Sequence, residues 1–353
     1  MRKSAKQSIL KRLFIGICFV ILIPLSTNAQ EYMIGADLSF MKEAEDKGFA
    51  FKENEQAKPG FEIFRDHGYN WVRLRLFHTP TTLPNSLEYT IEMAKEAKKH
   101  GFKFLLDYHY SDTWADPAKQ YIPKAWEGKS QEELEEAVFE YTRNTMISFR
   151  EAGVFPDMVQ VGNEISNGML WPNGKLPENW DHFAGLVQAG INGVYASCDN
   201  NRCPEIMIHI DKGGDLDFTK YFYDKITSYG IQYDVIGQSY YPWWHGSLLD
   251  LRACLNFTAE TYKKDVVLVE VAYNYQPQEY KDKKAPFPET PEGQKEFLEE
   301  VNRIILNIPN NRGKGIFWWE AAAPNKSFSS RTFFKNDGNV QPVISVFDKF
   351  SRH

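Results

Sequence analysis

The sequence contains 353 residues, of which 25% are charged and 15% are aromatic, and its formal net charge is −6. This length can form one α/β barrel or two smaller domains, and the composition excludes a largely disordered chain. The mild excess of acidic side chains disfavours nucleic acid as a partner. Abundant aromatic residues are typical either of a thick core or of a surface on which ligands stack.

The first 29 residues predict a secretory signal peptide. Five basic residues precede an apolar run from Leu13 to Leu25, and a small polar stretch then ends at Ala29. The apolar run is shorter than the roughly 20 residues that span a bilayer. We therefore expect cleavage near Ala29 and export of residues 30–353 to the periplasm, the cell surface or the medium. The cleaved chain would have a net charge of −11, and no later segment is apolar enough to span a membrane.

Three cysteines follow this leader. Cys198 and Cys203 enclose a short loop, and Cys254 lies far from both in sequence. Export permits disulfides, so a Cys198–Cys203 bond with a free Cys254 is the favoured pairing, although the spacing leaves other pairings open. No CxxC or Cys/His cluster indicates zinc.

From Met33 onward, short β-rich apolar runs alternate with longer amphipathic segments, without a repeat or linker to divide them. A capping box at Ser130 and Glu133 predicts the start of one helix, and Thr290 followed by Pro291 predicts another. The predicted strands are residues 33–37, 71–76, 103–108, 158–162, 206–210, 235–239, 266–269 and 315–318. This alternation predicts an α/β fold with a single (β/α)8 TIM barrel over residues 30–353. A doubly wound open sheet is the alternative, but no glycine-rich phosphate-binding turn follows any strand.

Polar and aromatic residues lie near the ends of the predicted strands or directly after them, where the active site of a barrel lies. They are Asp37, Arg73, Arg75, His109, Asp112, Asn163, Glu164, Tyr240, Glu270 and Trp319. Glu164 and Glu270 directly follow apolar runs, and a buried glutamate needs a partner or a function. Each could simply pair with Arg73 or Arg75 at the barrel rim. Together, on the fourth and seventh strands, they suggest the acid and the nucleophile of a glycosidase.

Five segments carry a closer resemblance. They are GADLSF (35–40), VRLRLF (72–77), DYHYSDTWADPAKQ (107–120), VGNEISNGMLWP (161–172) and SYYPWWHG (239–246). These segments resemble the arabinogalactan endo-β-1,4-galactanases of glycoside hydrolase family 53, and the resemblance covers nearly the whole chain after the leader. It implies endo-cleavage of β-1,4-galactosidic bonds in galactan, the type I arabinogalactan of pectin, with galacto-oligosaccharides as products.

The resemblance implies that Glu164 is the general acid/base and Glu270 the nucleophile of a retaining enzyme. The acid must hold a proton, so we expect a raised pKa for Glu164, while Arg73 or Arg75 keeps Glu270 ionised. We expect the two carboxyl groups to lie about 5–5.5 Å apart, whereas about 6.5–9.5 Å would indicate inversion.

Other residues are expected to bind the sugar chain. Asn163 would bond the sugar 2-hydroxyl, and Asp37, His109, Asp112 and Tyr240 would orient hydroxyls or carboxylates. Trp114, Trp171, Trp243, Trp244 and Trp319 follow predicted strands and suit the apolar faces of sugar rings. Core packing is the alternative for any single tryptophan. An extended cleft would favour endo-cleavage.

We predict no metal and no cofactor. Some bacterial members of the family bind calcium after the seventh strand, but here residues 272–293 lack an Asp/Asn ladder and contain several lysines. The first strand has no HxH pair for a catalytic metal. We expect a monomer that acts on a neutral polysaccharide.

Two alternatives remain. A mannanase or xylanase of the same barrel type would share both glutamate positions. A non-catalytic exported carbohydrate-binding protein would keep the aromatic cleft but lack an acid or a nucleophile, whereas both are present here.

Overall fold

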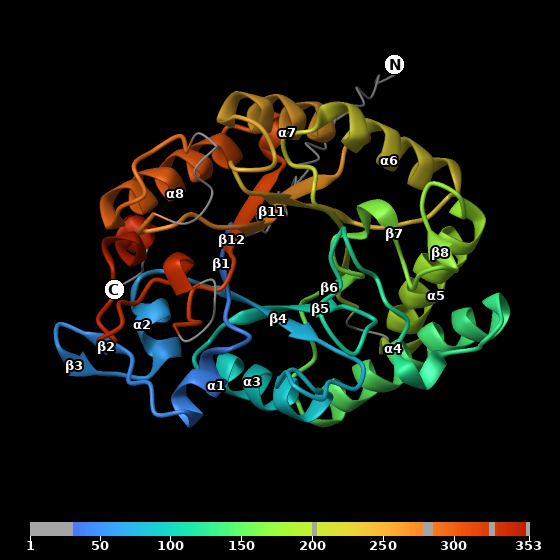
Figure 1. The fold of residues 1–353 in the computed structure, drawn as a ribbon, viewed down its shortest axis with the longest axis horizontal. Helices are drawn as coiled ribbons and strands as arrows, with labels where there is room; N and C mark the ends of the chain where they lie inside the picture. The colour runs from blue at the N-terminus through green and yellow to red at the C-terminus, as the bar shows by residue number, and fades with distance from the viewer. Residues whose placement is uncertain (1–30, 200–202, 278–284, 325–328, 351–353) are drawn as a thin grey trace, which may run out of the picture. The chain divides into compact units, whose positions relative to one another are not determined.

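Eight parallel strands close into a barrel in this computed structural model, which describes residues 31–199, 203–277, 285–324 and 329–350 (Figure 1). The barrel strands are β1 (Met33–Asp37), β4 (Trp71–Leu76), β5 (Lys103–Tyr108), β6 (Met158–Val161), β9 (Glu205–Ile210), β10 (Val235–Tyr240), β11 (Asp265–Val271) and β12 (Gly313–Trp318). β1 closes the ring by pairing with both β4 and β12. All eight predicted strands and the (β/α)8 barrel are confirmed.

The helices form an outer ring around these strands (Figure 1). They are α1 (Met41–Asp46), α2 (Gly60–Asp66), α3 (Leu87–Lys99), α4 (Gln131–Glu151), α5 (Trp180–Ser197), α6 (Leu216–Ser228), α7 (Leu248–Tyr262) and α8 (Pro291–Leu306). The predicted capping box of α4 is present, since Ser130 accepts from the backbone of Glu133 and the Glu133 side chain accepts in return. Thr290 caps α8, with Pro291 in the first turn.

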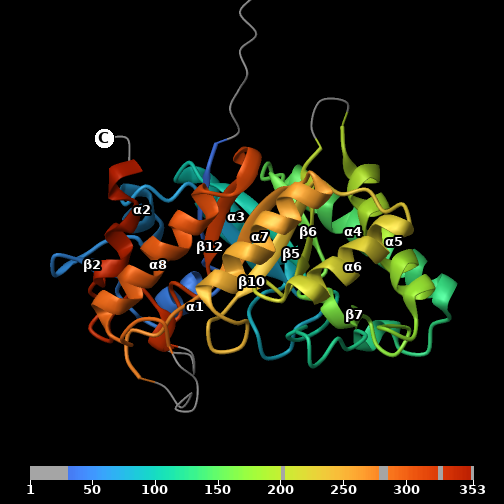
Figure 2. The ribbon, with the colours of Figure 1, turned by 90° about the horizontal axis from the view of Figure 1, so that it is seen from above.

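Short elements complete the chain. Two antiparallel ribbons pair β2 (Lys52–Glu53) with β3 (Gln56–Ala57) and β7 (Gly168–Met169) with β8 (Gly174–Lys175). The 3-10 segments are Lys124–Trp126, Ile165–Asn167, Pro309–Asn311, Ser329–Arg331 and Pro342–Phe350. The loops that follow the barrel strands gather on one side of the barrel, along the lower edge of Figure 2 where β7 is labelled.

The apolar core has two parts because strand side chains alternate between the two faces of the sheet. One part packs between the strands and the helices. The other fills the barrel and consists of Met33, Trp71, Leu105, Met158, Met207, Val235, Val267, Val269 and Phe317. Gly35 leaves room for this filling, since a Cβ there would lie 2.2 Å from the Phe317 ring. The interior is therefore a solid plug, and polar strand ends lie above it.

Three further predictions bear on the chain as a whole. The Cys198–Cys203 disulfide is confirmed, and Cys254 is a buried free thiol. Among the described residues, no helix is both long and apolar enough to cross a membrane. The predicted signal peptide, residues 1–29, lies outside the described residues. Tyr32–His353 make up one compact unit.

Candidate active site

A tight turn after β6 places Glu164 over the barrel. Gly162 has φ +83°, and a Cβ there would come within 2.6 Å of Ile165. Glu164 itself has φ 47°, a left-handed conformation that is unusual for a residue with a side chain. The carboxyl group is buried, with 8% of the residue exposed. Such backbone strain is common at functional sites, where it orients a reactive side chain.

A β-bulge in β11 turns Glu270 into the barrel. Val267 and Val269 belong to the barrel filling, so regular alternation would point residue 270 outward. Between β10 and β11 the register shifts after Gln238, and Ser239 pairs with Glu270. Val271 then faces the helices with the outer core. A bulge inserts one extra residue, which here lets both Val269 and Glu270 face inward.

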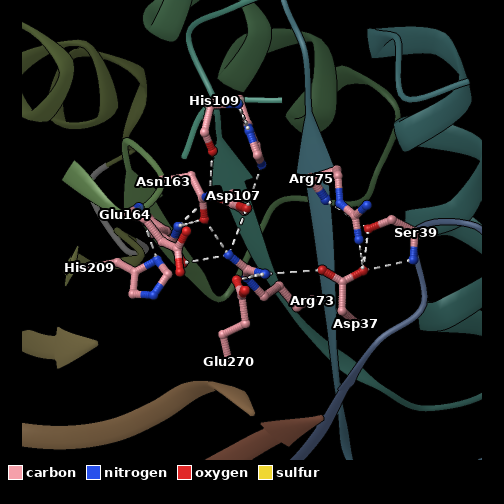
Figure 3. Close-up of polar contacts among 12 residues, drawn as sticks. Asp37, Ser39, Arg73, Arg75, Asp107, His109, Asn163, Glu164, His209 and Glu270 are labelled. Atoms are coloured by element: carbon pink, nitrogen blue, oxygen red, sulfur yellow. Dashed lines mark hydrogen bonds and ion pairs between the residues drawn. The ribbon is translucent and has the colours of Figure 1, made fainter. Parts of the chain in front are cut away.

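The two glutamates approach each other at the mouth of the barrel (Figure 3). One carboxylate oxygen of Glu164 and one of Glu270 lie within 4.8 Å of each other. Glu270 is held at both oxygens: Tyr241 donates its hydroxyl to Oε1 at 2.7 Å, and Arg73 donates to Oε2 at 3.1 Å. Glu164 Oε1 instead accepts from the hydroxyl of Ser239 at 2.7 Å. The pair therefore consists of one carboxylate beside a cation and one beside neutral donors.

Two arginines beneath this pair bind several buried carboxylates. Arg73 lies 3.1 Å from Asp37, 2.8 Å from Asp107 and 2.7 Å from the side-chain oxygen of Asn163. Arg75 lies 2.7 Å from Asp37 and also pairs with Glu320. Both guanidinium groups are almost fully buried. Unpaired charge in such a place is costly, so the arginines and carboxylates must be considered as one set.

The carboxyl groups in this set outnumber the guanidinium groups, so some of them are expected to hold protons. Two guanidinium groups face the five carboxyl groups of Asp37, Asp107, Glu164, Glu270 and Glu320. Burial raises the pKa of Glu320 to about 8, against the lowering effect of Arg75. Burial and the charge of Glu270 raise the pKa of Glu164 well above its ordinary value. Protons on these two groups would reduce the negative charge that faces the two cations.

The pKa of Glu164 is raised further than that of Glu270. Burial raises the pKa of both groups, but Arg73 and the Tyr241 hydroxyl oppose this rise on Glu270. On Glu164 the charges of Glu270 and Asp211 add to the effect of burial. This is the difference in environment that separates an acid from a nucleophile.

Asp107 and His109 form a second buried pair beside Arg73. Burial alone would raise the pKa of Asp107, but Arg73 and His109 outweigh it and lower the pKa to about 2. His109 Nε2 lies 3.2 Å from Asp107, and Nδ1 accepts from the backbone of Ala115. Burial lowers the pKa of His109, which favours the neutral ring. Its Nε2 therefore carries the proton and points at Asp107.

A cavity of about 240 Å³ lies over the two glutamates. Its lining includes eight of the sequence-predicted site residues: Arg73, Arg75, His109, Trp114, Asn163, Glu164, Glu270 and Trp319. The Trp114 and Trp319 rings lie 6.3 Å apart, and Arg75 stacks under Trp114 at 4.4 Å. Asp37 lies below this cavity, where it pairs with both arginines. One small cavity thus combines a carboxylate pair with an aromatic wall.

Two predicted tryptophans lie beyond this cavity. Trp244 is 45% exposed and lines a neighbouring pocket of about 530 Å³ together with Asp211 and His245. Trp171 lines a separate pocket beside Tyr121, where Lys175 stacks on its ring. Both rings are accessible to a ligand that extends past the carboxylates.

Three other predicted positions have different roles in the structure. Trp243 is 3% exposed and stacks on Tyr273 at 5.3 Å, so core packing, the alternative reading, holds for this tryptophan. Asp112 accepts from the backbone amides of Thr79 and Lys124, and so it ties two loops together. Neither residue lines the cavity over the glutamates.

Tyr240 also does not reach the site. Its hydroxyl donates to the carbonyl of Gly246, and its ring stacks against Phe297 in the outer core. Regular alternation along β10, with Val235 inside the barrel and Ile236 in the outer core, makes the next residue, Tyr241, the one that faces Glu270. The role expected of Tyr240 therefore passes to Tyr241.

Four residues of this buried network are not among the predicted site residues: Tyr241, His209, Ser239 and Glu320. Each had a weak signal. His209 interrupts the apolar run of β9, Ser239 and Tyr241 flank the end of β10, and Glu320 directly follows β12. A polar residue inside or just after a buried strand needs a partner, which was the argument that identified the two glutamates.

Three side chains at this site offer atoms of the kind that bind metal ions. One atom each of Glu164, His209 and Glu270 lies within 4.8 Å of the others. His209 is already engaged at both ring nitrogens, by the backbone of Glu164 and by Ser239. In the described part of the loop 272–293, Asn274 and Glu289 are bonded to each other. These donors are already bonded to protein groups, and residues 278–284 of that loop lie outside the described part.

A closed barrel with paired buried glutamates after β6 and β11, next to a tryptophan wall, is typical of glycoside hydrolases. Comparison with known proteins narrows this class. The chain belongs to glycosyl hydrolase family 53, because the family model matches residues 33–350. The family predicted from the sequence is thus confirmed.

Individual relatives agree with this assignment. An uncharacterized protein in the bgaB 5'region of Niallia circulans is 41% identical, over 90% of each chain. A probable arabinogalactan endo-beta-1,4-galactanase A of Neosartorya fischeri is 36% identical, over 86% of this chain and 88% of that protein. The solved GH53 catalytic domain of Ignisphaera aggregans has a TM-score of 0.84 at 30% identity, covering 94% of this chain and 99% of its own. The likeness therefore extends over almost the whole barrel.

Proposed function

We propose that Glu164 and Glu270 give this chain its activity, endo-cleavage of β-1,4-galactosidic bonds in galactan, by double displacement with retention. The observation that carries the mechanism is the close approach of the two buried carboxylates, within 4.8 Å. Retaining enzymes place these groups about 5–5.5 Å apart, and inverting enzymes need about 6.5–9.5 Å to admit a water. The galactan substrate follows from the family and from the galactanases among its relatives.

In the first step, a β-linked galactosyl unit lies in the cavity between Trp114 and the glutamates. Glu270 attacks the anomeric carbon, and the bond from this carbon to the leaving oxygen breaks. Glu164 transfers its proton to that oxygen, which departs as the 4-hydroxyl of the next sugar. Glu270 can act as a nucleophile because Arg73 and Tyr241 favour its ionised form.

In the second step, the covalent galactosyl-enzyme is hydrolysed. Glu164, now a carboxylate, removes a proton from a water that enters where the leaving sugar was. The oxygen of this water bonds to the anomeric carbon, and the bond to Glu270 breaks. Glu270 returns to its carboxylate form and Glu164 regains its proton, so two inversions give a β-configured product.

The surrounding residues bind and orient the chain. Asn163 accepts from Arg73 and donates one N–H to the carbonyl of Ala115, which leaves its second N–H for a sugar hydroxyl. Trp114 and Trp319 give the central sugar an apolar face. Trp244 and Trp171, on neighbouring pockets, suit sugars farther along the chain. An open row of such positions favours cleavage within a chain.

The cellular setting is part of this proposal. The basic and apolar leader of residues 1–29 supports export, and an exported galactanase would meet the galactan side chains of pectin outside the cell. A monomer is sufficient for the chemistry, because every residue named above comes from one chain.

Hydrolysis of purified galactan, xylan and mannan tests the substrate. We expect oligosaccharides from galactan and none from the other two, whereas release from xylan or mannan would favour the rival barrel hydrolases. Proton NMR of the first products tests the stereochemistry. The β-anomer should appear first, and an initial α-anomer would overturn the double displacement.

A further inference from the structure

A closed chain of hydrogen bonds begins and ends on Glu164. The backbone N–H of Glu164 donates to Nδ1 of His209 at 3.3 Å. The Nε2 atom of the same ring lies 2.8 Å from the hydroxyl of Ser239, and this hydroxyl lies 2.7 Å from Oε1 of Glu164. His209 and Ser239 are both fully buried. Figure 3 shows His209 directly beside Glu164.

The direction of every bond in this chain is fixed by its first member. A backbone N–H can only donate, so Nδ1 of His209 must offer its lone pair. Burial and the charge of Arg73 lower the pKa of His209 well below its ordinary value, so the ring is neutral. A neutral ring with an unprotonated Nδ1 carries its proton on Nε2. Nε2 therefore donates to Ser239, and the Ser239 hydroxyl has only Glu164 Oε1 left as an acceptor.

We propose that His209 and Ser239 are positioning residues that keep Oε1 of Glu164 as an acceptor and thereby place its catalytic proton on Oε2. This inference rests on the proposed role of Glu164 as acid/base. A proton on Oε1 would face the hydroxyl proton of Ser239, and two donors cannot share one hydrogen bond. The acid thus presents its proton from the oxygen outside the chain, in the cavity where the leaving oxygen departs.

The same arrangement serves both steps of the reaction. When Glu164 gives up its proton, the Ser239 hydroxyl already points at the new carboxylate and stabilises it. Other charged groups face Glu164 from several elements: Glu270 on β11, Asp211 after β9 and Arg73 on β4. None of these fixes which oxygen holds the proton, because none donates to Oε1.

Ser239→Ala tests the inference with two substrates. Cleavage of galactan needs an acid to protonate the leaving sugar. From 2,4-dinitrophenyl β-galactobioside, by contrast, dinitrophenolate departs without protonation. We expect kcat/KM on galactan to fall about 10-fold and on the dinitrophenyl substrate to stay within about twofold. The basic limb of the pH–rate profile on galactan should move up by about one pH unit, because the Glu164 carboxylate loses a hydrogen-bond donor and its pKa rises. Equal losses on both substrates, or an unmoved basic limb, would overturn the proposal.

Variants of His209 test the fixed direction. His209→Leu removes the donor to Ser239 and should reproduce the selective loss on galactan. His209→Gln keeps an N–H where Nε2 lies and should recover most of that loss. If the two variants behave alike, the direction of the chain does not matter and the inference fails.

Two controls separate this inference from its premises. Ser197→Ala removes an equally buried hydroxyl, bonded to the carbonyl of Val194 far from the site, and should leave both profiles unchanged. Glu164→Gln tests the proposed function itself. If it cleaves galactan like the wild type, the acid role fails. If it behaves as an acid variant while Ser239→Ala shifts nothing, only the positioning role fails.

Discussion

Glu164 and Glu270 are the same residue type at nearly the same depth, yet the structure surrounds them with opposite partners. Glu270 is bonded to a guanidinium group and a phenol, both of which favour its charge. Glu164 has a serine hydroxyl and a neutral imidazole, with the charges of Glu270 and Asp211 nearby. Depth alone therefore does not assign the roles. The neighbouring donors and charges decide which carboxyl group keeps the proton.

The largest expected effect comes from removing the proposed nucleophile. Glu270→Ala should lower kcat on galactan at least about 10⁴-fold, because no covalent intermediate can form. Added azide should restore turnover of 2,4-dinitrophenyl β-galactobioside and yield an α-galactosyl azide, since only one inversion occurs. Product analysis by NMR provides the measurement. A β-galactosyl azide from this variant would mean that Glu270 is not the nucleophile.

Removing the proposed acid should have a smaller and more selective effect. Glu164→Ala should lower kcat/KM on galactan by about 10²–10⁴-fold, the usual worth of general acid catalysis. The dinitrophenyl substrate should still form the covalent intermediate at a near-normal rate, seen as a burst of dinitrophenol. Azide should now give a β-galactosyl azide, because it attacks the intermediate on Glu270. Opposite azide products from the two variants would assign the two roles to different glutamates, whereas identical products would contradict this assignment.

Arg73 is the cation that separates the two environments. Arg73→Met should lower kcat/KM on galactan by about 10²-fold and shift its acidic limb to higher pH, because Arg73 lowers the pKa of Glu270. The free energy of unfolding should fall by about 3–5 kcal/mol, since Asp37 and Asp107 lose a buried partner. pH–rate profiles and urea titration measure these effects. If the acidic limb stays in place, Arg73 does not set the pKa of Glu270.

Much of this arrangement was predictable from the sequence. The eight strands are apolar runs buried on both faces, and the two glutamates follow such runs directly, so their position could be derived from burial alone. The tryptophans of the cavity, Trp114 and Trp319, could be placed only by assuming the barrel. The galactan substrate was predicted from the resemblance to family 53.

What the sequence could not predict depends on local register. The bulge that turns Glu270 inward arises from the pairing between β10 and β11, and period-two reasoning would assign Glu270 to the wrong face. In β10, by contrast, regular alternation from Val235 already places Tyr240 outward and Tyr241 inward. Asp112 was misplaced for a different reason, because its backbone partners lie on other loops. His209 could not be assigned, since its role depends on a backbone amide 45 residues away.

The smallest expected effect comes from the tyrosine beside Glu270, and its neighbour in the sequence provides the control. Tyr241→Phe removes a donor that lowers the pKa of Glu270, so the acidic limb should move to higher pH and kcat/KM should fall about 10-fold. Tyr240→Phe removes only the bond to Gly246 and should cost about 1 kcal/mol of unfolding free energy without moving the limb. If the acidic limb moved in Tyr240→Phe and not in Tyr241→Phe, Tyr240 would be the tyrosine that faces Glu270. Because the variants differ by one position, overall disruption cannot account for a shift confined to Tyr241, and the partner of the nucleophile is then identified directly.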